Sequence, residues 1–161
     1  MISDLDNKIF TKLEISDEFS YVTYDSTLDI KRTLKLKVGL KQLVRDVLKH
    51  SPPTPLELET AIALIEDEVM KLHKSLPLNS QLVSADRFIA NLTLAIDSNR
   101  QSSQKISIEE VEHLFDLLAS FSMGRPAAIA GIPEDSCFYA TLLILREFMH
   151  HLNFKSIYLC K

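Results

Sequence analysis

The sequence predicts an α/β fold in which helices pack over a mixed β-sheet. The N-terminal third alternates apolar and polar residues with a period of two, which is typical of half-buried strands. The rest repeats its apolar residues at helical spacing, and short strand-like runs interrupt these helices. Strands followed by helices that alternate with single strands indicate an antiparallel N-terminal meander joined to parallel strands.

The meander is expected over about residues 9–38. Ile9–Ile15 can form its first strand, and Phe19–Tyr24 is rich in the aromatic and β-branched residues that favour strands. Leu34–Val38 alternates apolar residues with two lysines, so the lysines of this third strand are expected to face water. Asp25–Ser26 provides a turn before it.

Helices and short strands are expected over about residues 39–161. The first helix begins near Leu40 and ends near His50, because two prolines follow and a residue before proline is disfavoured in a helix. The second has a clear start: Thr54 can cap it, Pro55 suits its first position, and Glu57 completes a capping box. Its buried stripe is expected to comprise Leu58, Ile62, Ile65, Val69 and Leu72.

The later elements follow the same reasoning. Ser107 and Glu110 form a second capping box, and the last helix carries apolar residues on more than one side, which predicts extensive burial. In chain order we expect a strand, a helix, a polar loop, a capped helix, a long helix and a final strand: Gln81–Val83, Phe88–Ile96, Asp97–Lys105, Ser107–Ser122, Phe138–Leu152 and Phe154–Cys160.

Length and composition are those of an ordinary globular domain. The 161 residues contain 46% hydrophobic and 25% charged residues, and no linker is visible, so one domain over residues 1–161 is expected. No apolar run approaches the roughly 18 residues of a membrane span. The start has no basic or apolar leader, and Cys137 and Cys160 have neither metal-ligand nor CxxC spacing, so we expect a cytoplasmic protein without membrane attachment.

Charge argues against nucleic acid as a partner. Eighteen basic and twenty-two acidic side chains leave a formal charge of −4, and the chain has no basic run. Since nucleic-acid binding depends on clustered lysine and arginine, we expect none.

Candidate metal and catalytic groups have simpler interpretations. His150 and His151 are adjacent on a helix and diverge by about 100°, so they do not readily share one ion. The acidic groups 66–68 and 109–112 are interpreted as solvated helix faces rather than magnesium ligands. No GxSxG or HExxH motif is present, so we predict no metal site and no catalytic residue.

Two stretches carry a family resemblance. The first is Lys35–Leu48 followed by Pro52–Pro55; the second is Ile106–Ser122, then Ala130–Pro133, and the helix and strand within Ala140–Leu159. In order and spacing they resemble the second, C-terminal domain of the exopolyphosphatase and guanosine pentaphosphatase (Ppx/GppA) family of the actin-like ATPase superfamily. The resemblance spans almost the whole chain and implies a ribonuclease H-like fold.

The resemblance also implies a first phosphate-binding turn, which this sequence alters. The family opens this domain with Asp-Ile-Gly-Gly-Gly-Ser-Thr-Glu, whose glycines let backbone N–H groups approach phosphate. Here Ser16, Asp17 and Glu18 replace the three glycines. A carboxylate about 4 Å from a phosphate charge costs about 4 kcal/mol at an effective dielectric constant near 20. The whole matching stretch is Glu14, Ile15, Ser16, Asp17, Glu18, Phe19, Ser20 and Tyr21.

The family's second glycine turn is altered as well. It falls on Ser84–Phe88, which contains no glycine. Within it, Arg87 can meet an anion at a helix start, although pairing with Asp86 is the simpler role. Gly39 and Gly131 lie where the family also has glycine and are expected to serve structural turns.

These observations favour a degenerate, exopolyphosphatase-related protein that has lost its phosphate-binding loops. We expect a non-catalytic interaction or regulatory module without cofactor, which forms a homodimer or binds a protein partner. One alternative is a phosphohydrolase of polyphosphate or guanosine polyphosphate that uses Mg²⁺ and is completed by a partner chain carrying the family's first domain. The other is a phosphate or nucleotide sensor that binds without turnover.

Overall fold

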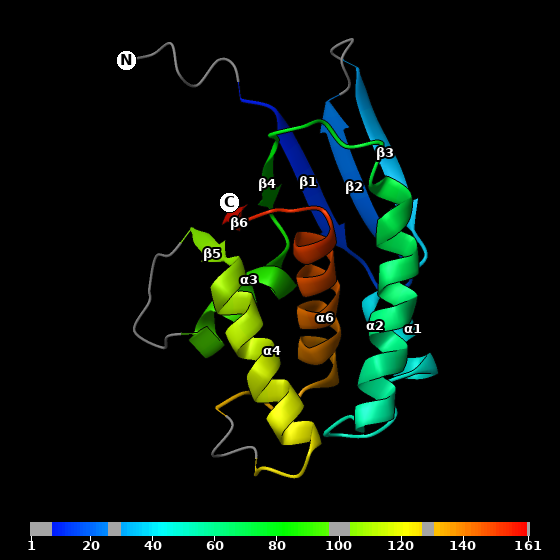
Figure 1. The fold of residues 1–161 in the computed structure, drawn as a ribbon, viewed down its shortest axis with the longest axis vertical. Helices are drawn as coiled ribbons and strands as arrows, with labels where there is room; N and C mark the ends of the chain where they lie inside the picture. Colours follow the sequence, from blue (N-terminus) through cyan, green and yellow to red (C-terminus); the bar gives the residue numbers. More distant parts are fainter. Residues whose placement is uncertain (1–7, 26–29, 97–103, 127–130, 161) are drawn as a thin grey trace.

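A computed structural model describes residues 8–25, 30–96, 104–126 and 131–160. Within them, six strands form one sheet in the order β3-β2-β1-β4-β6-β5 (Figure 1). The first three are an antiparallel meander, β1 pairs in parallel with β4 and β4 with β6, and β5 is antiparallel at the edge. The predicted mixed sheet is therefore confirmed. The strands are β1 Phe10–Ile15, β2 Ser20–Asp25, β3 Lys31–Leu36, β4 Gln81–Ser84, β5 Lys105–Ser107 and β6 Ser156–Leu159.

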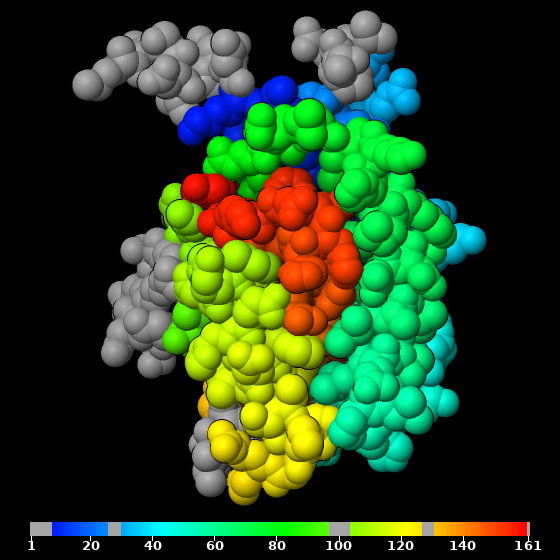
Figure 2. Space-filling view, viewed as in Figure 1, coloured from blue at the N-terminus to red at the C-terminus, as the bar shows by residue number. Residues whose placement is uncertain are grey.

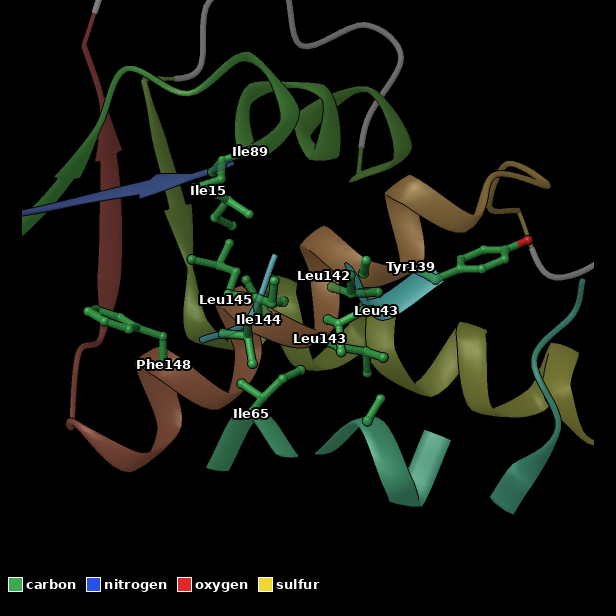
Figure 3. Close-up of a cluster of buried hydrophobic side chains, with 14 of the residues drawn as sticks. Ile15, Leu43, Ile65, Ile89, Tyr139, Leu142, Leu143, Ile144, Leu145 and Phe148 are labelled. Carbon is green, nitrogen blue, oxygen red and sulfur yellow. The ribbon is translucent and has the colours of Figure 1, made fainter. Parts of the chain in front are cut away.

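The helices gather around α6, which lies at the centre of the molecule (Figure 1). It contacts α1, α2, α3 and α4, and most of its side chains are buried, as its broad apolar stripe predicts. Figure 3 shows side chains of α6 directed toward Leu43 of α1, Ile65 of α2 and Ile15 of β1. The helices are α1 Leu40–Asp46, α2 Pro55–Val69, α3 Arg87–Ile96, α4 Ile108–Ser122 and α6 Ser136–His151, and the 3-10 helix η1 is Met70–Leu72.

The two faces of the sheet differ in burial. Leu13, Val22 and Leu82 point to the helices and are at most 1% exposed. The alternate positions, such as Lys35 and Tyr158, are exposed. Because successive side chains of a strand point to opposite faces, the sheet has one face in the core and one facing solvent.

Both predicted capping boxes form. The N–H of Glu57 donates to Thr54 Oγ1 at 3.1 Å, and the N–H of Thr54 donates to Glu57 Oε2 at 2.6 Å. At the start of α4, the N–H of Glu110 donates to Ser107 Oγ at 3.1 Å. These reciprocal bonds satisfy backbone donors that a helix start leaves unpaired, so α2 and α4 begin where the sequence predicts.

Several boundary predictions are wrong. The helix α1 ends at Asp46 rather than near His50, because Val47 leaves helical geometry with φ −130°. The third strand begins earlier than predicted and ends at Leu36, and β5 falls at the end of the expected polar loop. On α2, Ile62 of the predicted stripe is half-buried and packs against the core, and Ala61 is buried as well. The predicted turn at Ser26 and most of the loop from Asp97 lie outside the described residues.

In the part of the chain that the structure describes, no helix combines the length and apolar character required to cross a membrane.

Candidate functional site

The two segments that the resemblance matches to the family's glycine turns lie side by side, at the carboxyl ends of neighbouring strands. The first, Ser16–Phe19, follows β1, and the second, Ala85–Asp86, follows β4. Since β1 and β4 are parallel neighbours, both turns leave the sheet at its carboxyl edge. Ligands of α/β proteins commonly bind at this edge, so this is the candidate site.

The first turn is packed on the N-terminus of α1. Within the turn, the N–H of Ser16 donates to the carbonyl of Phe19 at 2.8 Å. The carbonyl of Ser16 accepts from the N–H of Leu40, and the carbonyl of Asp17 accepts from the N–H of Gln42, both at 3.0 Å. Donors at a helix start are the groups that could bind an anion, and here the turn's backbone occupies them.

Gly39 permits this close packing. A Cβ atom at this position would lie 2.5 Å from the carbonyl oxygen of Asp17 and 2.5 Å from the carbonyl carbon of Glu18. Its φ of −149° is ordinary extended backbone, so the requirement is space rather than an unusual conformation. Gly131 differs, because its φ of +75° is left-handed, as expected of a glycine in a turn. Gly39 therefore serves close packing at the start of α1, whereas Gly131 lies in a turn.

The acidic side chains of the first turn are paired. The Asp17 carboxylate lies 3.1 Å from Lys41 Nζ, and Arg45 donates to both carboxylate oxygens of Glu18 at 2.8 and 3.1 Å. The hydrogen bond from Arg45 lowers the pKa of Glu18. These exposed cationic partners neutralise much of the negative charge of Asp17 and Glu18. The repulsion of phosphate estimated from the sequence, which treated both carboxylates as unpaired, is therefore too large.

Asp86 is the central side chain of the second turn. Its carboxylate accepts a hydrogen bond from the N–H of Ile15 at the end of β1, at 2.7 Å, and another from the N–H of Phe88, at 2.8 Å. Its carbonyl accepts from the N–H of Ala90, so Asp86 is the N-cap of α3. Its own N–H donates to Ser84 Oγ at 3.0 Å, and that hydroxyl donates to the carbonyl of Leu13 at 2.6 Å. The protein's own carboxylate therefore holds two backbone donors at this edge.

Arg87 does not play the pairing role suggested by the sequence. Its side chain is exposed, and its guanidinium carbon lies 5.1 Å from the centroid of the Phe88 ring. Asp86 is bound to backbone N–H groups instead. Arg87 is therefore a cation at the edge of the site.

The remaining positions of the first stretch are structural. Ser20 is buried and donates its hydroxyl to the carbonyl of Val38 at 2.8 Å. Glu14 lies 2.8 Å from Lys12 Nζ, on the exposed face of the sheet. Tyr21 is half-buried opposite Glu14 in the β1–β2 ladder.

Two carboxylates expected on solvated faces form specific contacts. Glu68 accepts from the N–H of Lys37 at 2.9 Å and from Lys71 Nζ at 2.6 Å, and its side chain is only 14% exposed. Glu112 accepts from Arg146 Nε at 2.9 Å. The solvated interpretation is wrong for both, because each meets a partner from another part of the chain.

His150 and His151 diverge as predicted. His150 Nδ1 lies 3.8 Å from Glu112, whereas His151 Nε2 lies 2.9 Å from Glu147 and 3.9 Å from Glu66. Glu147 is buried and was not singled out by the sequence. An acidic residue four positions before a histidine on an apolar helix is the signal that could have identified it.

Comparison with known proteins relates this geometry to a family of structures. No protein-family model matches the sequence, and no curated protein matches it. Solved structures do match: a Ppx/GppA phosphatase from Aquifex aeolicus has a TM-score of 0.73 and 12% identity, over 99% of this chain and 55% of its own. An exopolyphosphatase from Cytophaga hutchinsonii has a TM-score of 0.68 and 15% identity, over 97% of this chain and 54% of its own.

The chain has the fold of the Ppx/GppA proteins. An exopolyphosphatase-like protein, at 9% identity and a TM-score of 0.67, gives the same result over 58% of its length. The chain therefore spans a little over half of the structures that it matches, about the size of their C-terminal domain. This actin-like ATPase fold agrees with the fold class predicted from the sequence.

Proposed function

We propose that this chain is a non-catalytic interaction or regulatory module that uses the Ppx/GppA C-terminal fold without binding phosphate at its two edge turns. The observation that carries the proposal is the position of Asp86. Its carboxylate accepts the backbone N–H groups of Ile15 and Phe88, at 2.7 and 2.8 Å, where an anionic ligand would need donors. A phosphate group would have to displace this charge and would also be repelled by it.

The first turn supports the same conclusion independently. Its carbonyls of Ser16 and Asp17 accept the N-terminal donors of α1. Gly39 lets the first turn approach the start of α1 closely enough to form these two hydrogen bonds. Opening the turn for a ligand would break both of them. Both sets of candidate donors are thus satisfied within the chain.

Ligand-dependent stability tests this proposal. The purified chain would be heated with and without millimolar phosphate, tripolyphosphate, guanosine polyphosphates and ATP, each with Mg²⁺. A ligand at 100 times its Kd stabilises the folded state by about 2.7 kcal/mol, which gives an easily measured shift in Tm. We expect no saturable shift. A saturable shift without hydrolysis would favour the sensor, and hydrolysis on addition of a chain that carries the missing domain would favour the split phosphohydrolase; either result overturns the proposal.

An exposed apolar stripe of three side chains, two on α2 and one on η1, supports a role in interaction. Leu56, Leu64 and Met70 are 71%, 40% and 45% exposed, and their spacing places them within about 120° around the helix axis. Figure 2 shows α2 exposed along one flank of the molecule. Exposed apolar side chains that share one flank of a molecule are a feature of interfaces. We propose a second copy of this chain as the partner, because a two-fold contact buries the stripe of both copies at once.

Sedimentation equilibrium tests the homodimer. The unaltered chain is expected to associate at micromolar to millimolar concentration, and Leu56→Glu combined with Leu64→Glu is expected to make it monomeric. Leu94→Glu, at a residue 66% exposed on α3, is the matched control and should leave association unchanged. A monomer at the highest concentration, or equal effects of the two changes, would exclude this interface.

A further inference from the structure

Three metal-ligating groups meet where the C-terminal end of α6 contacts α2. His151 and Glu147 are four residues apart on α6, so they share one face of that helix, and Glu66 reaches them from α2. His151 Nε2 lies 2.9 Å from Glu147 Oε2 and 3.9 Å from Glu66 Oε2. One ligand atom from each residue lies within 4.8 Å of the other two.

We propose that Glu66, Glu147 and His151 bind a divalent transition metal ion of the Zn²⁺ type. Ligand atoms about 2.05 Å from a tetrahedral zinc ion lie about 3.3 Å from one another. The two distances to His151 Nε2 lie on either side of this value, so a metal ion requires Glu147 Oε2 to move slightly away from Nε2 and Glu66 Oε2 to move closer. The Glu66 side chain is 46% exposed and can make that movement. One imidazole and two carboxylates suit zinc better than calcium, which takes six to eight oxygen ligands.

Arg146 holds the buried ligand in the orientation that a metal requires. Its NH1 group donates to Glu147 Oε1 at 2.7 Å, which leaves Oε2 directed toward His151. Its Nε group donates to Glu112 at 2.9 Å, so the guanidinium is itself fixed. The Glu147 side chain is only 3% exposed. Outer hydrogen bonds of this kind orient metal ligands and strengthen binding.

A pocket provides access and room for further ligands. A cavity of about 380 Å³ is lined by His151 and His73, together with the segments 76–80 and 152–154. A water molecule from this pocket can therefore supply the fourth ligand of a tetrahedral zinc site.

This site is separate from the two edge turns. It lies at the end of α6, just before β6 begins, whereas the turns follow the ends of β1 and β4. Because β1, β4 and β6 run in the same direction, the metal site lies at the amino ends of these strands and the two turns lie at their carboxyl ends. The metal proposal therefore does not depend on whether phosphate binds at the turns.

Metal titration of the full chain tests the proposal. After treatment with a chelator, Zn²⁺ would be titrated by calorimetry and Co²⁺ by its visible absorption, which reports tetrahedral coordination. We expect saturable 1:1 binding, weakened at least about tenfold by His151→Ala and by Glu66→Gln. His150→Ala and Glu59→Gln are the controls and should bind like the unaltered chain, because His150 faces Glu112 and Glu59 lies exposed on α2.

Circular dichroism of each variant separates loss of a ligand from loss of fold. Glu66→Gln changes a half-exposed side chain, so it is expected to stay folded even if His151→Ala does not. Absence of saturable binding by the unaltered chain overturns the site. Equal weakening by the His150 and His151 variants, or full affinity in folded Glu66→Gln, overturns it as well.

Discussion

Replacement of Asp86 by alanine is expected to destabilise the fold by about 2–4 kcal/mol. Loss of an N-cap side chain costs about 0.5–2 kcal/mol, and here the Phe88 N–H loses that cap. The Ile15 N–H also loses its acceptor, and an unsatisfied buried donor costs about 1–3 kcal/mol. Ile15 is only 4% exposed, so little water reaches that region of β1.

Urea unfolding of both proteins at pH 7 measures this effect. The midpoint should fall while the dependence of the unfolding free energy on urea stays unchanged, because the folded state keeps its extent of burial. Asp17→Ala is the matched control: its exposed carboxylate pairs with Lys41, so the change should be within about 0.5 kcal/mol. A loss of less than about 1 kcal/mol for Asp86→Ala would refute the structural role of this carboxylate.

Three further substitutions test other parts of the structure. Gly39→Ala should cost about 1–3 kcal/mol in thermal or urea unfolding, because the added Cβ meets the Asp17–Glu18 backbone; Ser16→Ala, at an exposed side chain, should cost almost nothing. Burial alone would raise the pKa of Glu57, but hydrogen bonds from the Thr54 N–H, from His50 and from the Lys49 N–H lower it to about 2. Because this pKa is below the ordinary 4.5, Glu57 contributes at most about 3 kcal/mol above pH 4.5, and this is lost as the pH falls toward 2. Glu57→Gln should lower stability at pH 7 and flatten the acid side of the profile; an unchanged profile would contradict this. Arg45→Ala should leave the Tm at pH 7 unchanged, since its pairs with Glu18 and Asp46 are exposed, and a clear fall in Tm would show that these pairs matter.

Local sequence signals predicted the helix starts and the sheet meander well. The capping boxes of α2 and α4 depend on residues three positions apart, so they are visible without knowledge of the fold. The predicted end of α1, near His50, was too late. After Val47 the chain leaves the helix and the Leu48 N–H donates to the Leu43 carbonyl, a hydrogen bond that no local sequence pattern predicts. The strand β5 has one buried residue, Ile106, which is too few for an alternating pattern.

The candidate site depends on contacts between distant residues. The bond from Ile15 N–H to Asp86 joins positions 71 residues apart, so the sequence showed an acidic residue in a glycine-poor turn but not its role. The same holds for Glu66, which meets Glu147 and His151 only because α2 packs on α6. The sequence therefore located the two glycine-poor turns, whereas the hydrogen-bond partners of their backbone donors could be seen only in the fold.

An NMR titration of the backbone amides tests the central claim most directly. The claim is that the N–H groups of Ile15 and Phe88 are held by Asp86, and those of Leu40 and Gln42 by the first turn. With tripolyphosphate and Mg²⁺ added to millimolar concentration, the account predicts no saturable shift of these four resonances. Saturable shifts centred on them would show that both turns open to bind phosphate, and would contradict the account.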